Sequence, residues 1–412
     1  MVDPCGAGQR ILLWQLLANR NAGPLGFLIM NKEILRMRFE NDLLESSFLN
    51  LDAIHVVPGG PRNRLVEGLV NTRRLKYGVV AIYSKDTSME EFCRDHSIPY
   101  YNFGYSKKTL IRQAFNLLSF VRLAKPKTLY LHSFYPSLLG ILLCVLQRKT
   151  IVIPVRHHNR VHSISKNRRG IVGDLAINKF ASHIVAVSDS VKSTMKLEGC
   201  SEKKIHVILN GVDTHFLRNE QKRNEFVSPR LNILAIGRLD WQKNYETMFL
   251  SLKILKTRGA DFTLHILGDG IPDYKESLIK IAEDLGILSN IVWEGWQKDV
   301  PNWFNKSDLF LHTALDEACP LVLIEALLHG IPMVSSNAGG SRDVLEGFYQ
   351  GVDAFDAQTF ADEILRFQQN PVIMTTYAKS IIARAEQKFS IEVACKEYVK
   401  LTEHLIGNRH LG

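Results

Sequence analysis

Short apolar runs alternate with helix-length segments twice along this chain of 412 residues, and a polar stretch separates the two series. Alternation of this kind predicts parallel β-sheets covered by helices on both faces, because each parallel connection needs a crossover helix. The chain also exceeds the usual size of a single hydrophobic core. The sequence therefore predicts an α/β protein of two doubly wound, Rossmann-like domains that face a cleft.

The first series predicts strands at residues 51–57, 78–83, 128–132, 150–155, 183–187 and 204–209, with a helical stretch to about residue 77 after the first of them. The second series predicts strands at residues 232–236, 263–267, 291–294, 309–313 and 332–336. Helices are expected between them at residues 245–258, 272–285, 300–305 and 320–329. In each sheet, ligands are expected beyond the carboxyl ends of the strands.

The polar stretch at residues 215–230 is nearly free of strand signals and has Pro229 near its end, so it is predicted to be a linker. We therefore expect one domain at residues 51–214 and a second at residues 231–383.

Residues 1–50 form an N-terminal extension whose role the sequence leaves open. Residues 11–30 are fairly apolar, but polar residues such as Gln15 and Arg20 interrupt them, and Pro24 would break a helix. The basic start and small-residue cleavage site of a signal peptide are missing. Three interpretations stay open: a pair of surface helices, a hairpin that rests on a membrane, and a misassigned start of the gene.

Composition places the chain among ordinary globular proteins. Hydrophobic residues make up 46% and charged residues 23%, which excludes disordered and fibrous classes. The six cysteines are scattered without a Cys-x-x-Cys pair, so they predict neither a zinc site nor a redox site. Free thiols suit a reducing cytoplasm, where we expect the protein, with peripheral attachment to the inner face of a membrane as a further option.

Positive charge is concentrated in the first half of the chain. Residues 1–228 carry 33 Lys and Arg against 18 Asp and Glu, whereas residues 229–412 carry 18 against 24. Between Asp95 and Asp174 there are 13 basic residues and no acidic one. A solvated basic face without function explains this pattern, and so does attraction to an anionic membrane or an anionic acceptor. The basic residues form no recognisable nucleic-acid-binding motif, so nucleic acid is not an expected partner.

Glycine turns follow the first two strands of the second series. After Gly237, both Arg238 and Lys243 can approach the carboxyl end of a strand, where a diphosphate would need two cations. Gly268 follows the next strand, but Asp273 stands where a dinucleotide fingerprint would have its third glycine. The second turn is therefore poor evidence for NAD, and it is either a simple turn or part of a nucleotide site.

Two glutamates eight residues apart form the most specific motif. Glu317 lies in a loop before a helix whose first turn is expected to contain Pro320, and Glu325 lies about a turn and a half inside that helix. Free backbone N–H groups near Leu321 and Val322 form an anion site together with the helix dipole. This spacing is common by chance, but the glycine turns, the paired cations and a later Asn-Ala-Gly-Gly loop together favour a functional interpretation.

This constellation resembles the family-4, or group 1, glycosyltransferases of the GT-B fold. The match in element order runs from about residue 51 to residue 389 and is strongest in the second domain. The resemblance implies that Arg238 and Lys243 hold the diphosphate of a nucleotide-diphosphate sugar donor. It further implies that Glu325 binds the ribose hydroxyls and Glu317 the hydroxyls of the donor sugar.

Further positions follow from the same resemblance. The remaining residues assigned to the donor site are Gly59, Gly60, Asn210, Gly237, Gly268, Leu321, Val322, Gly339 and Gly340. Residues 384–412 resemble the closing helix that crosses back to the first domain, which is then the acceptor-side domain. Ala318 replaces a usual glycine, and Arg342 and Asp343 replace a usual proline and glutamate, which bears on the sugar that is bound.

Histidines are expected on the acceptor side. The segment Val-Arg-His-His-Asn at residues 155–159 ends a strand where the family has an active-site histidine, so His158 is the first choice and His157 the second. A structural histidine is the alternative for each. His132 also ends a strand and is expected near the cleft. Glu317 completes the residues expected near the chemistry.

The resemblance implies a hexosyltransferase that retains the anomeric configuration and transfers to a glycan or lipid-linked acceptor. The chain has no Asp-x-Asp motif, so neither a metal nor another cofactor is expected beside the nucleotide sugar. The leaving diphosphate would be neutralised by Arg238, Lys243 and helix-end amides, and it would itself take the acceptor proton. Two alternatives stay open: another GT-B enzyme such as a sugar-nucleotide epimerase, and a catalytically silent subunit that binds a nucleotide sugar.

Overall fold

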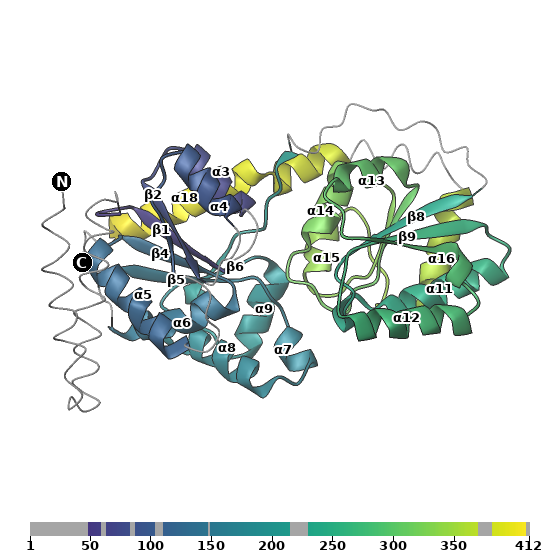
Figure 1. Cartoon of the computed structure of the whole chain (residues 1–412), viewed down its shortest axis with the longest axis horizontal. Helices are drawn as coiled ribbons and strands as arrows, with labels where there is room; N and C mark the ends of the chain where they lie inside the picture. Colours follow the sequence, from purple (N-terminus) through teal and green to yellow (C-terminus); the bar gives the residue numbers. More distant parts are fainter. Residues whose placement is uncertain are drawn as a thin grey trace, which may run out of the picture.

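The computed structural model confirms the predicted fold class, with two parallel sheets that are each covered by helices (Figure 1). It describes residues 48–58, 63–82, 87–103, 110–146, 149–214, 230–369 and 381–408. Gly59 and Gly60, nearly all of the N-terminal extension and nearly all of the predicted linker lie outside these ranges.

Seven parallel strands form the sheet of the first domain, in the order β3-β2-β1-β4-β5-β6-β7. The strands are β1 (Ala53–Pro58), β2 (Tyr77–Ile82), β3 (Tyr100–Asn102), β4 (Thr128–His132), β5 (Ile151–Arg156), β6 (Ile184–Ala186) and β7 (Ile205–Val207). The winding direction reverses between β1 and β4, and loops on either side of such a reversal leave room for a ligand.

Five parallel strands form the sheet of the second domain, in the order β10-β9-β8-β11-β12. The strands are β8 (Leu231–Ile236), β9 (Phe262–Leu267), β10 (Ile291–Gly295), β11 (Leu309–His312) and β12 (Met333–Ser335). The reversal lies between β8 and β11, so the loops that follow these two strands meet at the carboxyl edge of the sheet.

Helices cover both sheets (Figure 1). Those described in the first domain are α3 (Arg64–Asn71), α4 (Ser88–Asp95), α5 (Leu110–Ala124), α6 (Phe134–Leu146), α7 (Val161–Ile164), α8 (Arg168–Phe180) and α9 (Asp189–Leu197). Those after β8 are α11 (Tyr245–Thr257), α12 (Pro272–Asp284), α13 (Val300–Lys306), α14 (Leu321–Leu328), α15 (Gly340–Leu345), α16 (Ala357–Gln369) and α18 (Ile391–Asn408).

Burial on both faces explains why the strands are continuous apolar runs. In β1, Ala53 and Val57 pack into one apolar cluster, and Ile54 and Val56 pack into another. Successive side chains of a strand point to opposite faces of the sheet, so each face of β1 is covered. A strand in this position does not alternate apolar and polar residues, and β1 is visible in the sequence as a largely apolar segment that only His55 interrupts.

The predicted strands are all present, with every bound within two residues of its predicted place. The prediction missed β3 because its three residues are only half buried and carry no apolar run. It also missed α15, because that helix begins at Gly340 and glycine is typical of a loop.

The C-terminal helix α18 returns to the first domain and lies beside α3 (Figure 1). At the crossing, the N–H of Val212 donates to the carbonyl of Phe389 at 2.9 Å, and the N–H of Ile391 donates to the carbonyl of Val212 at 2.8 Å. Further along α18, the hydroxyls of Tyr130 and Thr402 are 2.8 Å apart. Helix α18 therefore packs into the core of the first domain. No helix in the described part of the chain is both long and apolar enough to span a bilayer.

Replacement of Thr402 by valine tests how α18 is anchored. Valine keeps the volume but removes the hydroxyl, so the hydroxyl of the fully buried Tyr130 loses its partner. An unsatisfied buried polar group costs about 1–3 kcal/mol, and the free energy of unfolding should fall by that amount in denaturant titrations. Lys400→Ala, at an exposed position of the same helix, is the control and should stay within about 0.5 kcal/mol of the wild type. Equal losses in both variants would contradict this anchoring.

Candidate active site

The loops after β8 and β9 touch through their backbones. The N–H of Gly237 donates to the carbonyl of Leu267 at 3.0 Å. Gly268 has a φ of +132°, and a Cβ there would lie 2.0 Å from the carbonyl oxygen of Gly237. Only glycine combines this conformation with so close an approach. Two residues predicted for the donor site are thus held together at the carboxyl edge of the second sheet.

Arg238 and Lys243 lie in different surroundings, although they are neighbours in one motif. The side chain of Arg238 is 75% exposed and contacts Asp240 at 3.0 Å. Lys243 ends a short 3-10 turn and is only 16% exposed, and its Nζ lies 2.5 Å from Oε1 of Glu317. Lys243 therefore joins the loop after β8 to the loop after β11, whereas Arg238 projects into solvent.

Glu317 is held as a carboxylate. Burial raises the pKa of its side chain, but the charge of Lys243 and a hydrogen bond with His312 outweigh burial and hold the pKa at about 2. His312 lies at the end of β11, with its Nε2 3.4 Å from Glu317 Oε1 and its Nδ1 3.2 Å from Ser335 Oγ. His312 was not predicted as a site residue, although it lies one residue before the end of a predicted strand, at the edge where a ligand was expected.

The helix α14 begins directly after the Glu317 loop. Pro320 was expected in the first turn but is the N-cap of α14, one position before the first helical residue. Its backbone is extended there, with a ψ of 109°. The N–H groups of Leu321 and Val322 belong to the first turn, which lacks partners within a helix and carries the positive end of the helix dipole. Glu325 lies one turn further along, and burial raises its pKa to about 7. The start of α14 thus offers hydrogen-bond donors beside a carboxyl group that titrates near neutral pH.

Gly339 and Gly340 support the backbone of the Glu317 loop. The N–H of Gly340 donates to the carbonyl of Glu317 at 2.7 Å. A Cβ on Gly340 would lie 1.7 Å from the carbonyl oxygen of Ala318, and a Cβ on Gly339, whose φ is +54°, would lie 2.4 Å from the carbonyl oxygen of Glu317. Both glycines are therefore required for the packing of one loop against the other.

Residues of the first domain contact these loops directly. Asn210 donates through Nδ2 to the carbonyl of Cys319 at 3.1 Å. The N–H of Ser190, at the start of α9, donates to Asp343 Oδ2 at 2.7 Å. A third contact is made by Asp316, which precedes Glu317 in the chain. Sequence analysis assigned no role to Ser190 or Asp316, because a polar contact between distant segments leaves no local pattern.

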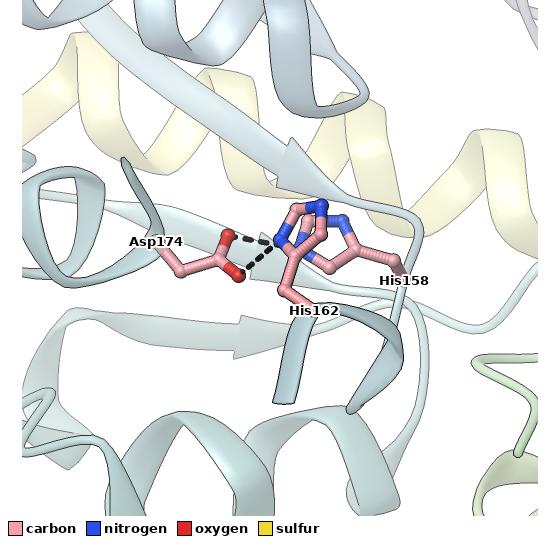
Figure 2. Close-up of side chains that lie close together, drawn as sticks. All are labelled: His158, His162 and Asp174. Atoms are coloured by element: carbon pink, nitrogen blue, oxygen red, sulfur yellow. Dashed lines mark hydrogen bonds and ion pairs between the residues drawn. The ribbon is translucent and has the colours of Figure 1, made fainter. Parts of the chain in front are cut away.

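His158 points into the first domain, toward Asp174 of α8 (Figure 2). Its Nε2 lies 2.8 Å from Asp174 Oδ1, and Nδ1 of His162 lies 2.9 Å from Asp174 Oδ2. Burial raises the pKa of Asp174, but the hydrogen bond and charge of His158, with the charge of Arg156, bring it below its usual value. Burial lowers the pKa of His158, partly offset by Asp174. The role of His158 toward a sugar stays a prediction.

His158, His162 and Asp174 also offer three ligand atoms that lie within 4.8 Å of one another. Two imidazoles and a carboxylate form a donor set that transition metals accept. Both imidazoles are already hydrogen-bonded to the carboxylate, however, and the guanidinium of Arg156 lies 3.7 Å from it. Since these contacts already compensate the negative charge of Asp174, we interpret the group as a hydrogen-bonded cluster.

His157 lies at one end of a row of histidines. Its Nε2 is 3.4 Å from Nδ1 of His132, whose Nε2 is 2.9 Å from Nδ1 of His55. Burial lowers the pKa of His157 to about 4 and that of His55 to about 3, and it lowers the pKa of His132 well below its ordinary value. The row is therefore neutral at physiological pH. His132 was expected near the cleft and is buried in the middle of this row. His55 was not predicted, because only its place in a strand is visible in the sequence.

Two Rossmann-like domains, each with a doubly wound parallel sheet, are the architecture of the GT-B class. The sequence model described as glycosyl transferases group 1 matches residues 218–388, and the one described as glycosyltransferase family 4 matches residues 63–216. The chain belongs to these glycosyltransferases, which confirms the resemblance drawn from its motifs.

Individual relatives agree with this assignment. The amylovoran biosynthesis glycosyltransferase AmsK of Erwinia amylovora is 27% identical over 50% of this chain and 52% of its own length. The UDP-Gal:alpha-D-GlcNAc-diphosphoundecaprenol alpha-1,3-galactosyltransferase of Escherichia coli is 29% identical over 41% of this chain and 46% of its own length. The chain thus spans about half the length of these curated relatives. The crystal structure of Anabaena HepE in complex with UDP and glucose has a TM-score of 0.71 at 19% identity, covering 85% of this chain and 99% of that chain, and it confirms the fold.

Replacement of Lys243 by methionine should destabilise the protein more than the same change at Arg238. The variant leaves Glu317 buried without its cation, and removing one partner of a buried ion pair costs about 3–5 kcal/mol. Arg238→Met removes an exposed contact that is worth less than about 1 kcal/mol. Denaturant unfolding of both variants measures the difference, and equal losses would contradict the distinct roles of the two cations.

The same ion pair predicts a dependence on pH. The folded pKa of Glu317, about 2, lies below its ordinary value of 4.5. The stabilisation from this group is therefore present above pH 4.5 and is lost as the pH falls from 4.5 toward 2. In Lys243→Met the unfolding free energy should show a weaker decline over this interval, because the carboxyl group no longer has its strongest partner.

Proposed function

We propose that the protein transfers a hexose from a nucleotide-diphosphate sugar to an acceptor hydroxyl. The observation that carries this proposal is the arrangement around α14, where Glu317 and Glu325 lie on either side of the helix start. The amides of α14, together with Arg238 and Lys243, supply positive charge for a diphosphate. The two glutamates would accept hydrogen bonds from the hydroxyls of the donor sugar and of the ribose. The names of AmsK, a glycosyltransferase, and of the HepE complex with UDP and glucose support the same reaction.

The proposed transfer retains the anomeric configuration and needs no metal ion. The bond from the acceptor oxygen to the anomeric carbon forms on the face where the bond to the diphosphate oxygen breaks, and the diphosphate takes the acceptor proton. Arg238, Lys243 and the amides of α14 stabilise the negative charge that develops on the diphosphate. Glu317 is already tied to Lys243, which suits hydrogen bonding better than nucleophilic attack. His157 or His158 would orient the sugar.

A glycan or a lipid-linked sugar is the proposed acceptor. AmsK is named for the biosynthesis of a polysaccharide, and the name of the Escherichia coli relative gives a sugar on diphosphoundecaprenol as its substrate. The excess of basic residues in the first half of the chain would attract the diphosphate of such a lipid.

Two alternatives differ from glycosyl transfer in what happens to the nucleotide sugar. An epimerase of the same fold would change the nucleotide sugar without an acceptor, and a silent subunit would bind it without change. Lys243 pairs with Glu317, which lies in the loop before α14, and Glu325 lies inside this helix. The presence of all three residues favours an active enzyme over a silent subunit. Chromatography of the nucleotide products separates the two enzymes, because only transfer releases a nucleoside diphosphate together with a glycosylated acceptor.

Replacement of Arg238 by alanine tests the diphosphate assignment. A thermal-shift panel of UDP-, GDP- and ADP-sugars first identifies the donor. A charge-assisted hydrogen bond is worth about 1.5–3 kcal/mol, so kcat/KM for that donor should fall about ten- to a hundredfold in Arg238→Ala. Arg258→Ala removes another arginine of the same domain, one that pairs with Asp362, and it should retain wild-type kinetics. Unchanged turnover in Arg238→Ala would remove the diphosphate assignment.

Transfer in excess EDTA tests the proposed mechanism. Because cationic side chains and helix-end amides take the place of a metal, turnover should be unaffected by the chelator. Proton NMR of the early product, read from the coupling of the anomeric proton, should show the configuration of the donor. Activity that is lost in EDTA and restored by magnesium, or an inverted product, would contradict this mechanism while leaving the fold assignment intact.

We also propose that the first domain rests on an anionic membrane surface. The helix α8 begins with Arg168 and Arg169, both exposed, and it presents Val172 and Leu175 with 65% and 43% of their area exposed. Lys179, near the end of the same helix, is also exposed. Apolar side chains among basic ones are typical of helices that lie in the interface of a bilayer.

Sedimentation with liposomes tests this surface. The protein should bind anionic vesicles at low salt and be released as salt rises, because charge attraction is screened. The variant Arg168→Glu/Arg169→Glu should bind much less. The matched control is Lys280→Glu/Lys298→Glu, which makes the same charge change at exposed sites of the second domain and should bind like the wild type. Equal binding of the wild type to neutral vesicles would contradict an electrostatic attachment.

A further inference from the structure

Asp316 joins the two domains directly. Its side chain is fully buried, with none of its area exposed. One carboxylate oxygen accepts a hydrogen bond from Nδ2 of Asn159 at 2.7 Å, and the other accepts one from the backbone N–H of Arg160 at 2.8 Å. Asn159 and Arg160 directly follow the two candidate histidines, and Asp316 directly precedes Glu317. A single carboxylate therefore joins two loops. One follows β5 and carries His157 and His158 (the histidine loop), and the other follows β11 and carries Glu317 (the glutamate loop).

These contacts continue on both sides of Asp316. In the first domain, Oδ1 of Asn159 accepts a hydrogen bond from Thr194 Oγ1 at 2.5 Å, which fixes the orientation of the amide. In the second domain, the carbonyl of Asp316 accepts a hydrogen bond from Nε2 of Gln242 at 2.6 Å. Because Gln242 is the neighbour of Lys243, Asp316 also connects the histidine loop with the loop proposed to bind phosphate.

A buried carboxylate needs hydrogen-bond donors, and both donors to the Asp316 side chain, the amide of Asn159 and the backbone N–H of Arg160, come from the other domain. Separation of the domains would expose the Asp316 carboxylate to water, whereas contact between the domains provides it with two hydrogen bonds. Burial raises the pKa of Asp316 above its usual value, and the hydrogen bonds from Arg160 and Asn159 offset part of this rise. The carboxylate is therefore tolerated in its buried position because these two donors of the first domain face it.

We propose that Asp316 is a positioning residue that holds the histidine loop over the donor site during transfer. This role rests on the proposed glycosyl transfer. Asp316 acts through Asn159 and Arg160 and does not itself contact the donor. The diphosphate and sugar groups of the donor bind to the second domain, whereas transfer also needs the loop of the first. Loss of Asp316 should therefore reduce turnover much more than donor affinity.

Amide hydrogen exchange at Arg160 tests the contact without any assay of activity. In Asp316→Asn, the amide has no negative charge and keeps only one acceptor oxygen, so the hydrogen bond from the N–H of Arg160 is lost or weakened. Exchange at Arg160 should become about tenfold faster or more. The matched control is Asp362→Asn, which makes the same change in an exposed pair with Arg258 and should leave exchange at Arg160 unchanged. Equal exchange in Asp316→Asn and the wild type would overturn the proposal.

Kinetics and binding then separate positioning from donor recognition. In Asp316→Asn, kcat should fall about tenfold or more, while the Kd for UDP stays within about threefold of the wild-type value. Asn159→Ala changes only the first domain and should give the same two effects, and the double variant should lose less than the two single losses combined. A loss of UDP affinity as large as the loss of kcat would overturn the proposal, because Asp316 would then support only the donor loop.

The two proposals fail in different ways. Absence of transfer by the wild-type protein with every donor and acceptor would refute the proposed function, while faster exchange at Arg160 in Asp316→Asn would still establish the contact between the loops. Normal transfer by Asp316→Asn would refute the positioning role and leave the proposed function intact. Circular dichroism of each variant confirms that a loss is not caused by unfolding.

Discussion

Glycine-to-backbone contacts hold the loops of the second domain together at the edge of its sheet. Gly268 lies against Gly237, and Gly340 lies against Ala318, at distances that leave no room for a side chain. These contacts fix the loop after β9 against the loop after β8, and the loop after β12 against the loop after β11. The ion pair of Lys243 with a glutamate 74 residues away then joins the first pair of loops to the second.

The two buried glutamates of one motif have pKa values that are shifted in opposite directions. Glu317 faces a cation and stays ionised far below neutral pH, whereas burial raises the pKa of Glu325 to about 7. In the first domain, burial keeps His157 neutral beside other histidines, while His158 lies against a carboxylate. The site thus combines one permanent anion, one carboxyl group of variable charge and neutral imidazoles, a mixture suited to binding hydroxyl groups on both sides of a diphosphate.

The strands and the glycine turns could be predicted from the sequence because their causes are local. An apolar run is enough to indicate a buried parallel strand, and β3 was missed because Tyr100–Asn102 has none. The contact of Asp316 with Asn159 could not be predicted, since the two residues are 157 positions apart and a polar pair has no periodicity. The direction of His158 was equally hidden, because it depends on where α8 places Asp174. Its sequence position at the end of a strand is compatible with either direction.

The chain passes between the domains twice, and the two passages are bonded to each other at Val212 and Ser390. Hydrogen bonds link them on both sides of this point, and Gly211 lies so close to Ser390 that a Cβ would come within 2.7 Å of its carbonyl oxygen. A single connecting segment would let one domain turn freely about it. Two segments that are hydrogen-bonded to each other resist this torsion, so the bonds at Val212 restrict how far one domain can rotate against the other.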